Sequence, residues 1–124
     1  MPPERVTAAG HVELLAFAPH GEVLPSADLV ITHSGHGTVM AAAGAGVPML
    51  CLPTGRDQPF VAGRVEALGL GVAIAPTSSP GDIAAAVAGM LAEPKWRAAA
   101  KAFAANVPRF GELERAAELV EQVA

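Results

Sequence analysis

Short apolar runs alternate along the chain with segments of helical composition. The runs Asp28–Thr32, Pro48–Leu52 and Gly71–Ala75 are almost continuously apolar, as is typical of strands covered on both faces. A further run, Leu14–Phe17, stops before Pro19 and predicts a short strand near the start. The pattern therefore predicts about four strands.

Predicted helices lie between these apolar runs and after the last of them. The predicted helices are Gly37–Ala45, a helix from Asp57 to Gly69, Pro80–Glu93, Lys95–Asn106 and Glu112–Val123. Asp57 is placed to cap the second helix, in which Val61, Val65 and Leu68 fall on one face at spacings of four and three. Strands that alternate with helices through short connections predict an α/β fold with a Rossmann-like parallel sheet, flanking helices and a helical tail.

The predicted sheet is smaller than a complete nucleotide-binding fold, which usually has about six strands. The 124 residues correspond to one domain. We therefore expect residues 1–124 to form a partial domain that lacks its first strands. A sheet with an exposed edge and a partly uncovered apolar face is also expected to self-associate.

Composition narrows the class of ligand. Hydrophobic residues make up 52% of the chain and charged residues 16%, with a net charge of −4. This balance indicates a folded domain and argues against nucleic acid or an anionic membrane as the partner. No apolar stretch approaches the roughly 20 residues of a membrane span, and the first residues do not resemble a signal peptide, so we expect a cytoplasmic protein. Cys51, the single cysteine, is expected to be a buried inert thiol.

The chemistry centres on a glycine-rich turn between a predicted strand and a predicted helix. Its candidate ligand-binding residues are His33, Ser34, Gly35, His36, Gly37 and Thr38. At the carboxyl end of a parallel strand, glycines let backbone N–H groups approach a ligand. The helix N-terminus adds unpaired donors and partial positive charge, which together form a phosphate site without lysine. The alternative is a structural turn whose histidines only hydrogen-bond their neighbours.

Other mechanisms fit this turn poorly. A nucleophile elbow would need glycine at position 32, where Thr32 stands. His33, His36 and Asp57 lack a further ligand at zinc-binding spacing. The dehydrogenase fingerprint and the lysine-containing P-loop are both absent, so we expect no metal and no cofactor.

Two further groups of polar or aromatic residues follow predicted strands. Asp57 and Gln58 stand close after the run that ends at Leu52, and a carboxylate beside an amide suits a polyhydroxylated ring. The alternative is that Asp57 only caps the helix. Phe17 is placed to stack on a nucleobase and His20 to reach a ribose hydroxyl, although a core role for Phe17 is the simpler reading without context.

These pieces, in this order, resemble the donor-binding domain of family 1 glycosyltransferases, the GT-B-fold enzymes of bacterial natural products and plant secondary metabolites. The resemblance runs from about Leu15 to Ile74. It is carried by Phe-Ala-Pro-His-Gly-Glu-Val-Leu-Pro, His-Ser-Gly-His-Gly-Thr, Ala-Gly-Val-Pro-Met-Leu, Arg-Asp-Gln-Pro and Arg-Val-Glu-Ala-Leu-Gly. Several spaced motifs make it far more specific than one glycine loop.

The resemblance implies a role for each candidate residue. His33 and the backbone of Gly35–Thr38 would hold the diphosphate of a UDP- or dTDP-sugar. Asp57 and Gln58 would hold sugar hydroxyls. Phe17 stands in the place of a base-stacking aromatic residue and His20 in that of a ribose-contacting glutamine.

Two positions depart from the family pattern. Ala41 stands where many members carry a glutamate that binds ribose hydroxyls, and Val61 stands where an asparagine commonly follows Asp-Gln. The phosphate and sugar motifs are unaffected. Ala41 leaves the choice between uridine and thymidine donors open.

The resemblance also implies that donor binding and catalysis are carried by different domains. In this family the acceptor site and the catalytic base lie in a separate N-terminal domain, for which these residues have no counterpart. We therefore assign no catalytic residue to this chain. The predicted function is donor binding in an inverting, metal-independent glycosyltransferase that moves a hexosyl group to a hydroxyl of a small lipophilic acceptor. The alternative is a non-catalytic nucleotide-binding fragment or a partner subunit of a split enzyme.

Overall fold

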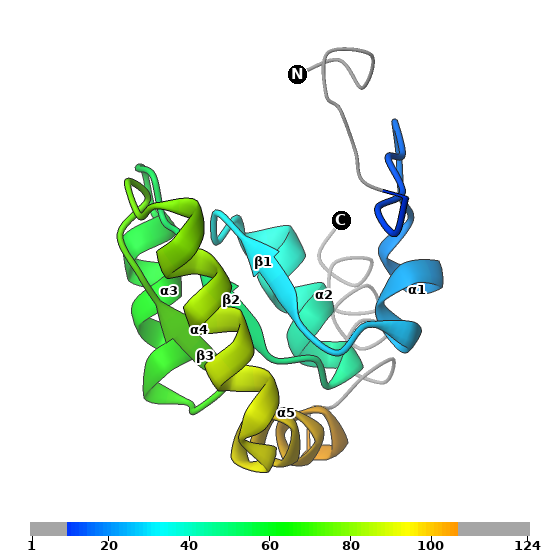
Figure 1. Ribbon diagram of the computed structural model, residues 1–124. Helices are drawn as coiled ribbons and strands as arrows, with labels where there is room; N and C mark the ends of the chain where they lie inside the picture. The colour runs from blue at the N-terminus through cyan, green and yellow to red at the C-terminus, as the bar shows by residue number, and fades with distance from the viewer. Residues whose placement is uncertain (1–9, 107–124) are drawn as a thin grey trace, which may run out of the picture.

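The computed structural model describes residues 10–106, and in that part of the chain three strands form one parallel sheet. The strands β1 (Val30–Thr32), β2 (Met49–Cys51) and β3 (Gly71–Ala73) follow one another in the sheet in chain order (Figure 1). Thr32 pairs with Cys51, and Cys51 pairs with Ala73. The carboxyl ends of all three strands are therefore level, and the loops that follow them share one edge of the sheet.

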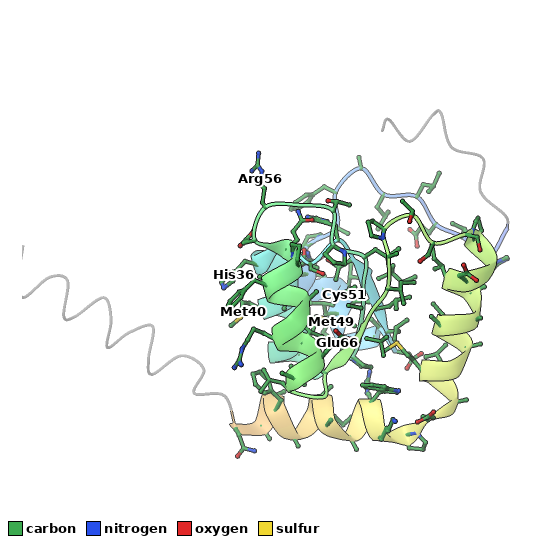
Figure 2. All side chains as sticks on the ribbon, turned by 90° about the vertical axis from the view of Figure 1, so that its left-hand side faces the viewer. His36, Met40, Met49, Cys51, Arg56 and Glu66 are labelled. Atoms are coloured by element: carbon green, nitrogen blue, oxygen red, sulfur yellow. The ribbon has the colours of Figure 1, made fainter. Side chains whose placement is uncertain are left out.

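Two layers of helices enclose this sheet. The helices α2 (His36–Ala45) and α3 (Gln58–Ala67) connect successive strands, and right-handed crossovers in the same direction place both on one face. The helix α4 (Pro80–Ala92) covers the other face, and α5 (Pro94–Asn106) lies at the far end of the domain (Figures 1 and 2). The Arg97 guanidinium donates to the carbonyl of Ala27 at 2.9 Å and fixes α5 at the amino end of β1.

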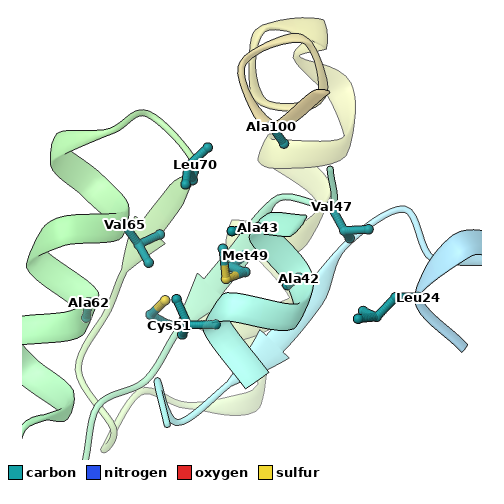
Figure 3. Close-up of a cluster of buried hydrophobic side chains, with 11 residues drawn as sticks. Leu24, Ala42, Ala43, Val47, Met49, Cys51, Ala62, Val65, Leu70 and Ala100 are labelled. Carbon is teal, nitrogen blue, oxygen red and sulfur yellow. The ribbon is translucent and has the colours of Figure 1, made fainter. Parts of the chain in front are cut away.

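The core lies between the sheet and the α2–α3 layer. β2 is buried along its whole length because it is the central strand. Most of the buried side chains in this cluster are small or medium in size: Leu24, Val39, Ala42, Ala43, Val47, Met49, Cys51, Ala62, Val65, Leu70 and Ala100 (Figure 3). Many of them are alanines, so the helices pack closely rather than over bulky side chains.

The predicted strand Leu14–Phe17 is wrong. The segment has no regular structure, and Leu14, Leu15 and Phe17 are all exposed. A strand needs a neighbour for its backbone groups, and β1 pairs only with β2 in the described part of the chain. A short helix, α1 (His20–Val23), and a 3₁₀ turn, η2 (Leu24–Ser26), follow instead.

The helix boundaries agree with the sequence to within one or two residues. Gly46, directly after α2, and Gly69, two residues after the end of α3, both adopt φ of 72°, as expected where a helix closes in the left-handed region. The predicted apolar face of α3 is only partly buried, because Val65 is buried while Leu68 remains 44% exposed. The predicted helix Glu112–Val123 lies outside the described residues.

Residues 10–106 contain no helix that is both long enough and apolar enough to cross a membrane.

Candidate functional site

The turn between β1 and α2 has a tightly defined backbone. The Ser34 N–H donates to Thr32 Oγ1 at 3.1 Å, and Ser34 adopts φ of 76°, in the left-handed region that side chains rarely enter. Gly35 then caps α2 with an extended backbone. The chain thus turns within three residues from the end of β1 into the first turn of α2.

The N-terminus of α2 carries backbone donors without a side-chain cap. The first helical bond runs from the Val39 N–H to the Gly35 carbonyl at 3.0 Å. The N–H groups of His36, Gly37 and Thr38 precede it, so they have no carbonyl within the helix, and no side chain caps them. A Cβ at Gly37 would meet no atom within 4 Å, so the surface there is open. These donors and the helix dipole suit an anion.

His33 and Gly35 are packed against each other in this turn. A Cβ built on Gly35 would lie 2.9 Å from His33 Nε2, so the imidazole covers the glycine. Glycine at position 35 therefore keeps the exposed His33 ring beside the free N–H groups of α2. His36, by contrast, projects beside α3 on the outer side of the α2–α3 layer (Figure 2).

The loop between β2 and α3 contributes the second part of the site. Gln58 Oε1 accepts from the Thr54 N–H at 2.8 Å, from Thr54 Oγ1 at 2.7 Å and from the Gly55 N–H at 3.3 Å. The acceptor of this side chain is therefore used within the loop, which leaves its NH₂ group to donate outward. Arg56 adopts φ of 57° at the tip of the loop and points away from the domain (Figure 2).

Asp57 occupies the N-cap position of α3 but does not cap it. Its backbone has αR geometry, and its side chain accepts no hydrogen bond from the helix. The alternative that Asp57 serves only as a helix cap is therefore wrong. Its carboxylate is exposed at the edge of the sheet and free to accept hydrogen bonds from a ligand.

The two loops are neighbours because the strands that lead into them are paired. The Leu52 N–H donates to the Thr32 carbonyl at 2.8 Å, one residue beyond the last pair of β1 and β2. Donors at the α2 N-terminus and the Asp57 carboxylate thus lie on the same edge. Among residues 10–106, no three His, Cys, Asp or Glu side chains gather in a group able to hold a metal ion.

Phe17 and His20, the remaining two sequence candidates, differ in their surroundings. Phe17 is 81% exposed, which excludes the core role considered above. His20 begins α1 and lines a shallow pocket of about 290 Å³ together with Ala41 of α2. The structure therefore brings the imidazole to the position where the family glutamate is absent.

Thr54 was missed in the sequence, although it holds Gln58 in place. Both its N–H and its hydroxyl donate to Gln58 Oε1. The signal was its position four residues before Gln58, which is a turn geometry that short polar side chains favour.

Ser34 and Cys51 lie beneath the turn and are both fully buried. Burial raises the pKa of the Cys51 thiol above its ordinary 9.0; the Ser34 hydroxyl counteracts this and Glu66 adds to it. Ser34 Oγ makes no hydrogen bond of normal geometry within the described residues.

We expect the stability of the domain to fall at alkaline pH through Cys51. Because the pKa of Cys51 is raised in the folded state, the thiol ionises at lower pH in the unfolded chain than in the folded domain. The stability that the neutral Cys51 thiol contributes is therefore complete below pH 9.0 and is lost as the pH rises through the folded-state pKa. Urea unfolding at pH 8 to 11 should show this loss in the wild type, and Cys51→Ala should show a smaller one. Equal pH slopes in the two proteins would contradict the assignment.

Comparison with known proteins identifies the family of this fold and this loop arrangement. Residues 3–119 match the family described as erythromycin biosynthesis protein CIII-like, C-terminal domain. The chain belongs to this family. The match covers most of the chain, and the family comprises C-terminal domains of glycosyltransferases of the GT-B fold.

Relatives of the CIII-like family agree in sequence and in structure. Zeaxanthin glucosyltransferase from Pseudescherichia vulneris is 32% identical over 115 residues, which cover 93% of this chain and 28% of that enzyme. The glycotransferase of kitacinnamycin has a TM-score of 0.81 at 30% identity and covers 94% of this chain and 32% of its own. The glycosyltransferase VinC, solved in complex with DTDP, has a TM-score of 0.77 at 30% identity. This match covers 93% of this chain and 31% of VinC. The chain thus spans less than a third of the length of each.

These findings confirm the resemblance to GT-B glycosyltransferases and the α/β fold class. The described sheet has three strands rather than the predicted four. The relatives are nucleotide-sugar glycosyltransferases, and the CIII-like domain fits the donor-binding part of such an enzyme.

Proposed function

We propose that this CIII-like domain binds the nucleotide diphosphate sugar in a transferase that moves a hexosyl group to a hydroxyl of a small lipophilic acceptor. The observation that carries the proposal is the uncapped N-terminus of α2 beside the free carboxylate of Asp57. An anion site next to a hydroxyl-binding carboxylate matches the two halves of a sugar diphosphate.

Each part of the donor has a binding group on this edge. The diphosphate lies on the N–H groups of His36, Gly37 and Thr38, with His33 beside it. The sugar hydroxyls donate to Asp57 and accept from the Gln58 amide, whose carbonyl oxygen is held by Thr54. Phe17 provides the exposed ring for the base, and His20 faces the ribose.

The reaction proceeds with inversion and without a metal ion. A base in an acceptor domain removes the proton from the acceptor hydroxyl as the oxygen attacks the anomeric carbon, and the bond to the diphosphate breaks on the opposite side. The negative charge that develops on the leaving diphosphate is met by the helix dipole and the fixed N–H groups of α2. No residue of this chain is assigned a proton-transfer role.

The residue at the proposed ribose site, Ala41, favours a thymidine donor over a uridine donor. Ala41 provides no carboxylate for the ribose hydroxyls of a uridine donor, and a 2′-hydroxyl without a partner costs about 1–3 kcal/mol if buried. A thymidine donor has no 2′-hydroxyl to satisfy. The solved complex of VinC with DTDP supports this choice by analogy.

We expect thymidine diphosphate to bind at least as tightly as uridine diphosphate, which titration calorimetry with both nucleotides measures. Ala41→Glu should shift the ratio towards uridine diphosphate by about tenfold, or about 1.4 kcal/mol. The matched control Ala41→Gln adds similar volume without the charge. A tenfold preference of the wild type for uridine diphosphate would reverse the assignment, and no binding of either nucleotide would remove the proposed function itself.

A further inference from the structure

The strand β1 lies at one edge of the described sheet, and the backbone of its central residue faces away from β2 (Figure 1). The Val30 N–H donates to the Pro48 carbonyl at 3.0 Å. The Leu52 N–H donates to the Thr32 carbonyl at 2.8 Å. In a parallel pair, alternate residues of a strand bond to the same neighbour, and the residue between them faces the other way. The N–H and the carbonyl of Ile31 therefore have no hydrogen-bond partner within the described residues.

The side chain of Ile31 is uncovered as well. Side chains of a strand alternate between the two faces of the sheet. Thr32 is buried and Val30 packs against the core, so both lie on the face that α2 and α3 cover. Ile31 therefore lies on the opposite face, and it is 53% exposed. An open backbone edge beside an exposed apolar side chain is a template for pairing with another strand.

The other edge of the sheet, at β3, is closed by a side chain. The Ile74 N–H donates to the Cys51 carbonyl at 2.9 Å, so the backbone of the preceding residue, Ala73, faces away from β2. The Ala73 N–H donates to Glu66 Oε2 at 3.1 Å. A charged side chain at an edge strand opposes the addition of a further strand. Strand pairing is therefore favoured at β1 and disfavoured at β3.

We propose that two copies of this chain pair through β1 in antiparallel orientation, with a two-fold axis at Ile31. Ile31 is the centre of a three-residue strand, and its N–H and carbonyl both face outward. Two copies related by this axis exchange two hydrogen bonds between their Ile31 residues, and each Val30 stands opposite Thr32 of the other copy. The strand carries no charged residue, so no like charges meet across the axis.

This pairing produces a closed dimer. Three strands from each copy form one continuous sheet, which has a β3 strand at both of its ends. Because Glu66 occupies the free N–H of Ala73 at each end, the sheet does not add further copies. The two Ile31 side chains lie on the same face with their Cβ atoms about 4.5–5.5 Å apart. Each covers apolar surface of the other, which stabilises the dimer.

Sedimentation equilibrium over a range of protein concentrations tests the proposal. We expect the wild type to reach twice the mass of the single chain. Ile31→Lys places like charges on the axis, and Ile31→Pro removes the donor without breaking a bond to β2, so both should weaken the dimer at least about tenfold. Phe60→Lys is the matched control and should leave the dimer intact. Phe60 is 73% exposed on α3 and lines the apolar groove between α2 and α3, which is the other candidate contact surface.

Cross-linking tests the position of the axis. In a Cys51→Ala background, a short bismaleimide should join two copies of Ile31→Cys, whereas Phe60→Cys should stay uncross-linked. Glu66→Ala should release the β3 edge and give assemblies larger than a dimer, while Glu66→Gln, which keeps an acceptor oxygen, should not. A wild type that stays monomeric would overturn the proposal. So would a dimer that Phe60→Lys dissociates and Ile31→Lys does not, because its contact would lie on the groove.

Discussion

Gly71→Ala should unfold most of the domain at temperatures where the wild type is stable. Gly71 begins β3 and is buried against β2, and a Cβ there would overlap the backbone carbonyl of Met49. Because a strand backbone cannot rotate away as a side chain can, β2 and β3 would have to separate. We expect a loss of about 3 kcal/mol or more, at the upper end of overpacking effects, and a melting temperature lower by about 10 °C or more.

Gly63→Ala provides the matched control for this substitution. Gly63 lies inside α3, where a Cβ would meet no atom within 4 Å. Alanine in a helix interior should stabilise the domain by about 0.5–1 kcal/mol relative to glycine. Thermal unfolding followed by circular dichroism measures both variants. A melting temperature of Gly71→Ala within about 2 °C of the wild type would contradict the register of β2 and β3.

Gly37→Asp should separate folding from donor binding by changing them in opposite directions. Position 37 lies in the first turn of α2, where a carboxylate interacts favourably with the helix dipole by about 0.3–1 kcal/mol. The domain should therefore be at least as stable as the wild type. The same carboxylate stands beside the N–H groups proposed to hold the diphosphate, so nucleotide diphosphate affinity should fall at least about tenfold.

Gly37→Asn is the control for the size of the new side chain. Asparagine matches aspartate in shape but carries no charge, so it should lose less affinity than Gly37→Asp. The difference between the two variants should also shrink as salt is raised, since screening weakens charge repulsion. Calorimetry with thymidine diphosphate at two salt concentrations measures this. Equal affinities of Gly37→Asp and the wild type would show that the diphosphate does not lie on α2.

Local sequence was sufficient to predict most of the secondary structure. The strands β1, β2 and β3 fall inside the predicted apolar runs. Only β2 is buried along its whole length, as expected of a strand covered on both faces, whereas Ile31 of β1 is 53% exposed. The helix ends at Gly46 and Gly69 were readable because left-handed backbone favours glycine. The sharp turn between β1 and α2 was readable for a similar reason, because glycine fits a tight strand-to-helix junction; its phosphate-binding role stays a prediction.

Tertiary pairing decided what local pattern could not. Leu14–Phe17 has the composition of a strand, yet a strand forms only where its backbone pairs with a neighbour, and within the described residues this segment pairs with no strand. Asp57 has the sequence position of a helix cap, but its backbone has αR geometry, so its exposed carboxylate accepts no hydrogen bond from the helix. The sequence predicted that the Gln58 side chain both donates hydrogen bonds to a sugar and accepts them from it. In the structure its carbonyl oxygen already accepts from the Thr54 hydroxyl, so only its NH₂ group remains to donate to a ligand.

The sequence by itself determined the order of the elements, the family and the residue types of the candidate site, because these follow from local periodicity and motif spacing. Only the tertiary structure decided which residues meet. The level ends of β1 and β2 bring the turn of α2 beside Asp57, and the packing of α1 on α2 brings His20 to Ala41. It also decided that Phe60 and Met40 remain exposed on one groove, because exposure depends on neighbours that are distant in the chain.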